Sequence, residues 1–134
     1  MANTITENAL NRQTWASTAG LASLQRKDIA SITGDTAIAA PTTATNGFAL
    51  GQLANAIVPI AVTGGTIDVT LWVGFISDSN PSIIIWNIAP GTGALSLTAE
   101  GGWLTQTGRA DRIAMQVVIS AGAPTFSINI GGFQ

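Results

Sequence analysis

Apolar residues recur at every second position in several stretches of this chain, and this alternation constrains its fold more than any other feature. The clearest stretch is residues 66–77, which has apolar side chains at Ile67, Val69, Leu71, Val73 and Phe75. Successive side chains of a β-strand point to opposite faces, so a period of two places all five on one face. We therefore predict a strand with one face in the core and with Trp72 and Ile76 on the outer face.

Further strands are expected along most of the chain after residue 37. Similar patterns occur in four more stretches: 57–63, 94–99, 112–120 and 125–130. Pro59 has no backbone N–H, which favours an edge position for its strand. Residues 82–88 form a continuous apolar run. Such a run is typical of a strand that is buried on both faces or that lies between subunits.

Glycine and proline divide these stretches, and we expect a turn at each division. Turns are predicted at residues 78–81, 90–93, 108–111 and 121–124, and the strand over residues 57–63 is expected to end at Gly64-Gly65. Six to eight short strands that are separated in this way indicate a sandwich or a barrel. We predict an all-β fold, in which residues 36–134 form a single jelly-roll-like β-sandwich.

Residues 1–35 lack a clear alternation and are expected to form an N-terminal arm. Thr4 and Glu7 have the spacing of a capping box, in which a hydroxyl and a carboxylate satisfy the first free N–H groups of a helix. The segment also holds Arg12, Arg26 and Lys27, which are three of the five basic residues. We predict an arm, partly helical or extended, that lies on the domain or on a neighbouring subunit.

Charged residues are scarce in this chain. Asp, Glu, Lys and Arg make up 9 % of the 134 residues, against about 25 % in an ordinary soluble domain. The surface must therefore be neutral and rich in hydroxyl groups, or much of it must be buried against other subunits. The net charge is −2 and the basic residues form no run, which argues against binding to a nucleic-acid backbone.

The composition also removes most catalytic chemistry. The chain has no His and no Cys, so a Ser-His-Asp nucleophile lacks its base and the usual zinc sites are excluded. Glu100 with Asp68 or Asp111 is the least implausible carboxylate pair, and we interpret Glu100 as a turn residue. A helix that spans a membrane needs about 20 consecutive apolar residues, and no apolar run in this sequence approaches that length. We expect a protein that is not an enzyme and that binds no cofactor, metal, nucleic acid or membrane.

Tryptophans and the few charged residues are the candidates for contacts with other subunits. A large aromatic side chain on an outer face often marks a contact. Residues 109–112 hold the densest charge of the chain, and we interpret them either as an ion-pair cluster between subunits or as a solvated turn. The candidate contact residues are Trp15, Arg26, Lys27, Trp72, Ile76, Trp86, Arg109, Asp111 and Arg112.

The expected β domain is rich in Thr, Ala, Gly and Ile, lacks His and Cys, and follows a polar arm. In these features the chain resembles bacteriophage virion proteins. The resemblance lies in overall composition and is closest to the capsid decoration, or cement, proteins, many of which are jelly-roll-like trimers. It implies a structural protein on the capsid surface of a virion that clamps neighbouring capsomers. It also implies a homo-oligomer, with a trimer favoured, whose partners are the major capsid protein or other virion subunits.

Two other interpretations remain open from the sequence. One is a different virion part, such as a tail, collar or fibre component. The other is a carbohydrate-binding β-sandwich module that uses Trp72 or Trp103 as a stacking platform. A binding module should be monomeric with an exposed Trp, whereas a decoration protein should be a tight oligomer with its Trp residues buried at subunit contacts.

Overall fold

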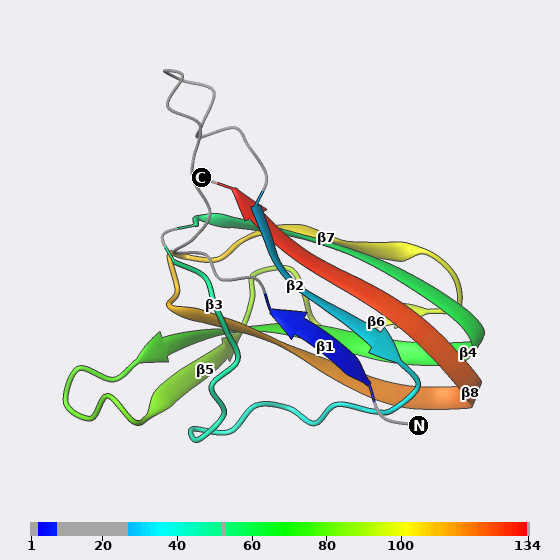
Figure 1. Cartoon of the computed structure of the whole chain (residues 1–134), viewed down its shortest axis with the longest axis horizontal. Coiled ribbons are helices and arrows are strands. Elements are labelled where there is room, and N and C mark those ends of the chain that lie inside the picture. Colours follow the sequence, from blue (N-terminus) through cyan, green and yellow to red (C-terminus); the bar gives the residue numbers. More distant parts are fainter. Residues whose placement is uncertain (1–2, 8–26, 52, 134) are drawn as a thin grey trace, which may run out of the picture.

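The computed structural model describes residues 3–7, 27–51 and 53–133, and these residues form strands and loops without a helix. The strands are β1 (Thr4–Glu7), β2 (Lys27–Gly34), β3 (Phe48–Ala49), β4 (Asn55–Ile76), β5 (Ile84–Ile88), β6 (Leu95–Leu97), β7 (Gly101–Gln106) and β8 (Arg112–Phe133). They form one open antiparallel sheet in the order β1-β2-β8-β4-β5 (Figure 1). Strand β3 also pairs with β8, and β6 and β7 also pair with β4. The prediction of an all-β fold is therefore confirmed.

Two long strands organise the sheet. β4 and β8 have 22 residues each and pair from Asn55 opposite Phe133 to Gly74 opposite Arg112. Figure 1 shows both strands turning back together at the right-hand edge, so that the two halves of the sheet lie one over the other. The buried residues of both halves belong to one hydrophobic cluster. The bend thus allows a single sheet to enclose a core.

Glycines at the bend allow the two backbones to approach each other. Gly64 and Gly122 have φ values of +83° and +71°, which side chains rarely allow, and Gly65 lies opposite Gly122. A Cβ atom on Gly122 would lie 2.8 Å from the carbonyl oxygen of Gly64, and one on Gly65 would overlap the carbonyl oxygen of Ala121. The register also shifts between Thr63 and Gly65.

The predicted strand end at Gly64-Gly65 and the predicted turn at residues 121–124 are therefore wrong. Both segments are bends inside continuous strands, because they lie opposite each other and remain paired through the bend. Local sequence does not distinguish a glycine that ends a strand from a glycine that bends one, since the difference depends on the partner strand.

The predicted alternations are confirmed on both sides of the bend. Ile67, Val69 and Leu71 are fully buried and Val73 is 3 % exposed. The buried face of β8 likewise includes Ile113, Met115, Val117, Phe126, Ile128 and Ile130. Phe75 continues the same face but is 37 % exposed, because it lies beyond the end of the core cluster.

The predicted edge position of Pro59 is wrong. Its strand, the first half of β4, lies between β7 and β8, and Pro59 is paired with Gly102 of β7. On the other side, the ladder between β4 and β8 runs from Ile57–Gly131 to Ile60–Ile128 with no pair recorded between them. The missing N–H of proline is tolerated inside the sheet at this interruption of the ladder.

The N-terminal strands were also not foreseen. Thr4 and Glu7 lie in an extended strand that pairs with β2, so the predicted helix start at this capping box is wrong. The Glu7 carboxylate instead accepts a hydrogen bond of 3.0 Å from the backbone N–H of Ala49, which ties β1 to β3. Strand β2 contributes Ile29, Ala30 and Ile32 to the core. The sheet therefore includes strands from the first 35 residues, where an arm was expected.

Buried threonines hold the loops beside β4. Thr92 is fully buried, and its hydroxyl lies 2.8 Å from the carbonyl oxygen of Ala89 and 3.1 Å from that of Leu71. We expect Thr92→Val to lower the free energy of unfolding by about 1 kcal/mol, since the hydroxyl's hydrogen bonds are lost while both carbonyls keep a backbone N–H donor. Urea unfolding followed by tryptophan fluorescence measures this loss. The exposed Thr98→Val is the matched control, and equal stability of the two variants would contradict the expectation.

Candidate functional site

The end of the sheet opposite the bend is formed by a hairpin of β4 and β5. The predicted turn at residues 78–81 is confirmed: the N–H of Ile83 donates to the carbonyl oxygen of Asn80 at 2.9 Å. The Oδ1 atom of Asn80 accepts hydrogen bonds from the N–H and the hydroxyl of Ser82, at 3.2 and 2.7 Å. The turn is thus held by its own polar groups, as asparagine in a turn allows.

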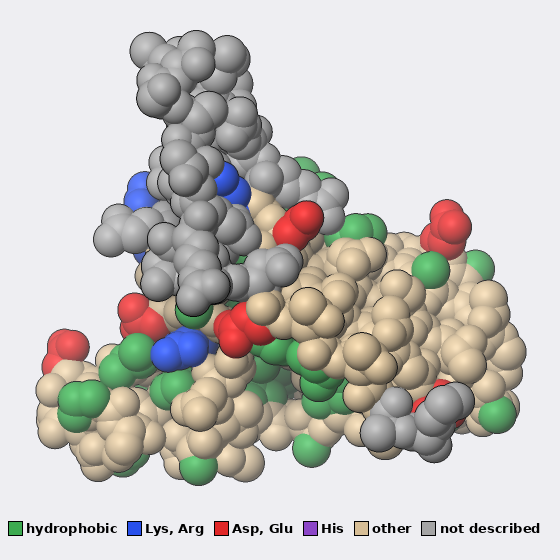
Figure 2. Space-filling view, in the orientation of Figure 1, with side chains coloured by type: hydrophobic (Ala, Val, Ile, Leu, Met, Phe, Trp, Pro, Cys, Tyr) green, Lys and Arg blue, Asp and Glu red, His purple; other side chains and the backbone are tan. Residues whose placement is uncertain are grey.

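Four large apolar side chains are exposed on this hairpin. Phe75 and Ile76 are 37 % and 36 % exposed, and Ile85 and Ile88 are each 49 % exposed. We refer to these four residues as the hairpin surface. Phe75 is paired with Ile85 on one face, and Ile76 and Ile88 lie on the other face with Trp72. Figures 1 and 2 show the hairpin at the left-hand end of the molecule, where apolar side chains reach the surface.

Residues 82–88 are thus not buried on both faces within one chain. Strand β5 is the last strand in the sheet order, and among the strands that the structure describes it pairs only with β4. Its apolar side chains continue past the end of the core, and no residue within 3–7, 27–51 or 53–133 belongs to a core that covers Ile85 and Ile88. The alternative of a strand between subunits stays a prediction. Exposed apolar edge strands are rare in proteins that remain unpaired.

Trp72 lies on the outer face of β4, as the alternation predicted. It is half-buried rather than fully exposed, and its indole N–H donates to the Oε1 atom of Gln116 at 3.1 Å. Its neighbour along this face is Gly74, where a Cβ atom would lie 2.7 Å from Ile84 and 2.9 Å from the Trp86 ring. Gly74 therefore allows two large side chains of β5 to lie close against β4.

Trp86 lies between β4 and the loop that precedes β3. A Cβ atom on Gly47 would approach the Trp86 ring to 2.6 Å, and the N–H of Ile84 donates to the carbonyl oxygen of Thr43 at 3.1 Å. The Nε1 atom of Trp86 is buried and has no hydrogen-bond partner among the described residues. A buried indole N–H without a partner is unusual in a folded chain.

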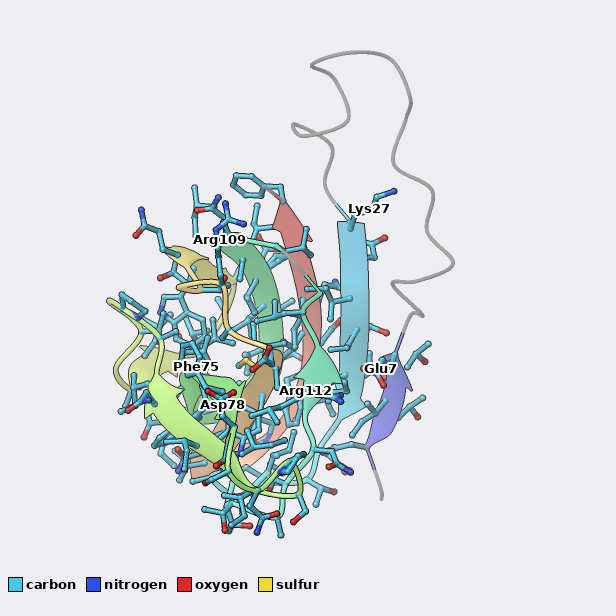
Figure 3. All side chains as sticks on the ribbon, turned by 90° about the vertical axis from the view of Figure 1, so that its left-hand side faces the viewer. Glu7, Lys27, Phe75, Asp78, Arg109 and Arg112 are labelled. Atoms are coloured by element: carbon cyan, nitrogen blue, oxygen red, sulfur yellow. The ribbon has the colours of Figure 1, made fainter. Side chains whose placement is uncertain are left out.

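The charged residues 109–112 lie beside this hairpin. The Asp111 carboxylate accepts a hydrogen bond of 2.8 Å from the N–H of Ile76, and the N–H of Asp111 donates to the carbonyl oxygen of Gly74 at 2.9 Å. Arg109 is exposed with a φ of +55°, and Arg112 is half-buried and paired with Gly74. Figure 3 looks onto this end and shows Phe75, Asp78, Arg109 and Arg112 there. Asp111 thus holds the backbone at the C-terminal end of β4 in place.

Six of the nine candidate contact residues lie together in this region. They are Trp72, Ile76, Trp86, Arg109, Asp111 and Arg112. Lys27 lies elsewhere, at the start of β2 opposite Gly132, and Trp15 and Arg26 fall outside the described residues. Sequence reasoning missed Phe75, Ile85 and Ile88 as surface residues, because their apolar pattern is the same as that of core residues.

The remaining predicted chemistry is scattered. Trp103 packs against the core, so it is not a free stacking platform, and Glu100 is exposed just before β7.

Among residues 3–7, 27–51 and 53–133, no three carboxylate, His or Cys side chains are grouped as metal ligands. The same part of the chain has no helix that is long and apolar enough to cross a membrane. Figure 2 shows that much of the visible surface is neither charged nor apolar.

Comparison of the chain with protein-family models, with curated proteins and with solved structures finds no match.

Proposed function

We propose that this chain is a non-enzymatic structural protein of a virus particle, which binds and stabilises the capsid shell through subunit contacts. The observation that supports the proposal is the hairpin surface: four exposed apolar side chains on one edge hairpin, two on each face. A contact that buries such a cluster gains roughly 25 cal/mol for each Å² of apolar surface removed from water. Tail, collar or fibre attachment would use the same surface in another part of the particle.

The hairpin of residues 72–88 holds one ionisable side chain, that of Asp78 in its turn, and this supports assembly rather than recognition of a charged ligand. The described ionisable groups nearest to it are those of Asp78, Arg109, Asp111 and Arg112, and Asp111 is bonded within the chain. Interface centres are depleted in charged residues and enriched in aromatic and large aliphatic ones. A trimer and a jelly-roll-like arrangement of the bent sheet, with an N-terminal arm, stay predictions that belong to this proposal.

The first experiment is the solution mass of the full-length chain, measured by light scattering after size exclusion. We expect a stable oligomer, with a mass of three times 13.6 kDa for the favoured trimer. A second measurement is co-sedimentation with tailed-phage capsids that lack their decoration protein. A monomer at all concentrations that also fails to bind to such capsids would overturn the proposal.

A further inference from the structure

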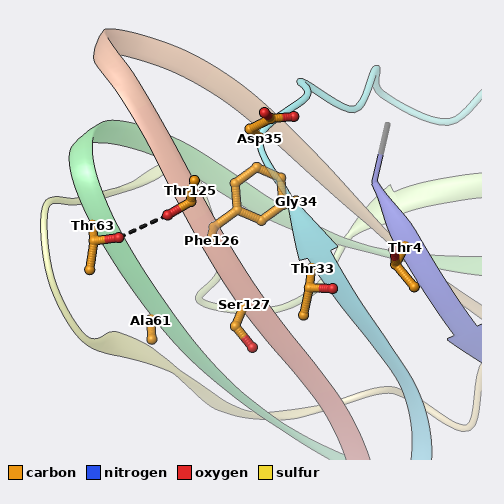
Figure 4. Close-up of a pocket in the computed structure, with 9 residues that line it drawn as sticks. All are labelled: Thr4, Thr33, Gly34, Asp35, Ala61, Thr63, Thr125, Phe126 and Ser127. Carbon is orange, nitrogen blue, oxygen red and sulfur yellow. Dashed lines mark hydrogen bonds between the residues drawn. The ribbon is translucent and has the colours of Figure 1, made fainter. Parts of the chain in front are cut away.

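A shallow trough crosses the outer face of the sheet on the other side of the bend from the hairpin surface. Its main part has a volume of about 480 Å³ and lies over β1, β2, β8 and the first half of β4 (Figure 4). A second hollow of about 320 Å³ shares Ala61 and Ser127 with it and continues toward β7. Sites for small ligands have volumes of roughly 300–1,000 Å³. The trough is thus large enough for a small ligand.

The strand register places hydroxyl groups in rows along the trough. Ser127 of β8 lies opposite both Ala61 of β4 and Thr33 of β2, and Thr33 lies opposite Thr4 of β1. These residues form one row across four strands, with about 4.8 Å between neighbouring strands. Ala61 has the smallest side chain of this row and leaves space in the floor, at the position that the two hollows share.

The hydroxyl groups of the trough have free hydrogen-bonding capacity. Those of Thr63 and Thr125 are 2.8 Å apart and share one hydrogen, so the pair retains one donor and several acceptor positions. The hydroxyls of Thr33 and Ser127 make no hydrogen bond to any other residue that the structure describes. Asn129 adds an amide, which both donates and accepts. A ligand with many hydroxyl groups matches this mixture of donors and acceptors.

Charge and shape narrow the class of ligand. Asp35 and Glu100 are the ionisable residues that line the two hollows, and both are acidic, which disfavours phosphate, sulfate and carboxylate ligands. Phe126 also lines the trough but is only 4 % exposed, so it provides no broad stacking platform. Most of the surface of the main hollow is formed by apolar atoms, so a ligand covers this apolar surface while the hydroxyl and amide groups form hydrogen bonds that fix its orientation.

We propose that this trough binds a neutral oligosaccharide, which lies across the strands with its sugar hydroxyls on the row of Ser127, Thr33 and Thr4. The site is separate from the hairpin surface and needs no contact between subunits. It also differs from the sugar site expected at Trp72 or Trp103, since neither residue lines the trough.

The test is a titration of the full chain with maltohexaose, cellohexaose and chitohexaose by calorimetry and by ¹H–¹⁵N correlation spectra. We expect at least one hexasaccharide to bind and to shift the amide signals of Thr33, Ala61 and Ser127. The double variant Thr33→Val with Ser127→Ala should weaken this binding about tenfold, since two hydrogen bonds are lost. The matched control is Thr98→Val with Ser96→Ala, which removes two exposed hydroxyls outside the trough and should leave the affinity unchanged.

Three results would overturn the proposal. The first is that none of the three hexasaccharides binds at millimolar concentration. The second is that the control double variant weakens binding as much as the trough variant does. The third is preferential binding of a tetralysine peptide that is lost in Asp35→Asn with Glu100→Gln, because the trough would then be a site for cationic peptides. None of these results depends on the oligomeric state or on binding to capsids, so they do not decide the proposed function.

Discussion

Gly65→Ala is expected to lower the free energy of unfolding by about 2–3 kcal/mol, because the added methyl group overlaps the carbonyl oxygen of Ala121 on the paired strand. Neither backbone can move away easily, since both strands are paired on each side of the bend. A loss of this size is a large share of the about 5–15 kcal/mol that stabilises a typical domain. Urea unfolding followed by tryptophan fluorescence measures it.

The matched control for this substitution is Gly93→Ala. A Cβ atom on Gly93 has no heavy atom within 4 Å, and no positive φ is recorded there. We expect a change of no more than about 0.5 kcal/mol in this variant. Equal stability of the two alanine variants would show that the close approach at the bend is not what constrains residue 65.

Replacing Ile85 and Ile88 together by Asp is expected to convert the proposed oligomer to single chains. Both side chains are 49 % exposed, so charges there should cost the isolated chain little, whereas burial of two carboxylates in a contact is costly. A contact can bury only the exposed half of each side chain, so the two lost isoleucines together account for about 1.5–3 kcal/mol, which is a weakening of about tenfold to a hundredfold. Light scattering over a range of concentrations measures the shift.

Leu104→Asp is the control for the hairpin variant. Leu104 is 66 % exposed on β7 and is not part of the hairpin surface, so it tests the general effect of an added carboxylate. Dissociation by Leu104→Asp alone, or an unchanged mass in the hairpin variant, would place the contact elsewhere. Trp72→Ala is a poorer probe, because Trp72 is hydrogen-bonded to Gln116 and its loss also affects the folded chain.

The strands and their buried faces could be predicted from the sequence where the alternation is unbroken. The apolar residues at every second position of 66–73 and 113–117 are buried as predicted, and the structure adds only that Thr70 and Ala114 on the opposite face are buried too. The joining of these stretches into two strands of 22 residues could not be predicted. It depends on the pairing of Gly65 with Gly122, which are far apart in the sequence.

Strand β2 was missed for a different physical reason. Its pairing with β8 has an irregularity between Asp28 and Ala30, so the consecutive residues Ile29 and Ala30 are both buried. A bulge of this kind changes the phase of the alternation. The sequence pattern therefore gave no sign of a strand, although three of its side chains belong to the core.

The candidate contact region was predicted in part. Trp72 and Ile76 were placed on the outer face by their period, and the register of β4 with β5 and β8 then brought Trp86 and Arg112 beside them. Phe75 was assigned to the core because it continues the alternation of apolar residues. The alternation shows which face of the strand a side chain lies on, but it does not show where along the strand the core ends. The hydroxyl rows of the trough likewise depend on the pairing of four strands, which the sequence does not specify.

The pairing of β4 with β8 also determines the order in which this chain can fold. Gly74 lies opposite Arg112, whereas Asn55 lies opposite Phe133, so the separation along the chain grows steadily from one end of the ladder to the other. During synthesis, β4 leaves the ribosome long before its partner does, and its edge stays unpaired until β8 follows. Pairing that begins beside the hairpin and proceeds through the glycine bend closes the smallest loop first. Such distant contacts are typical of proteins that fold in milliseconds to seconds.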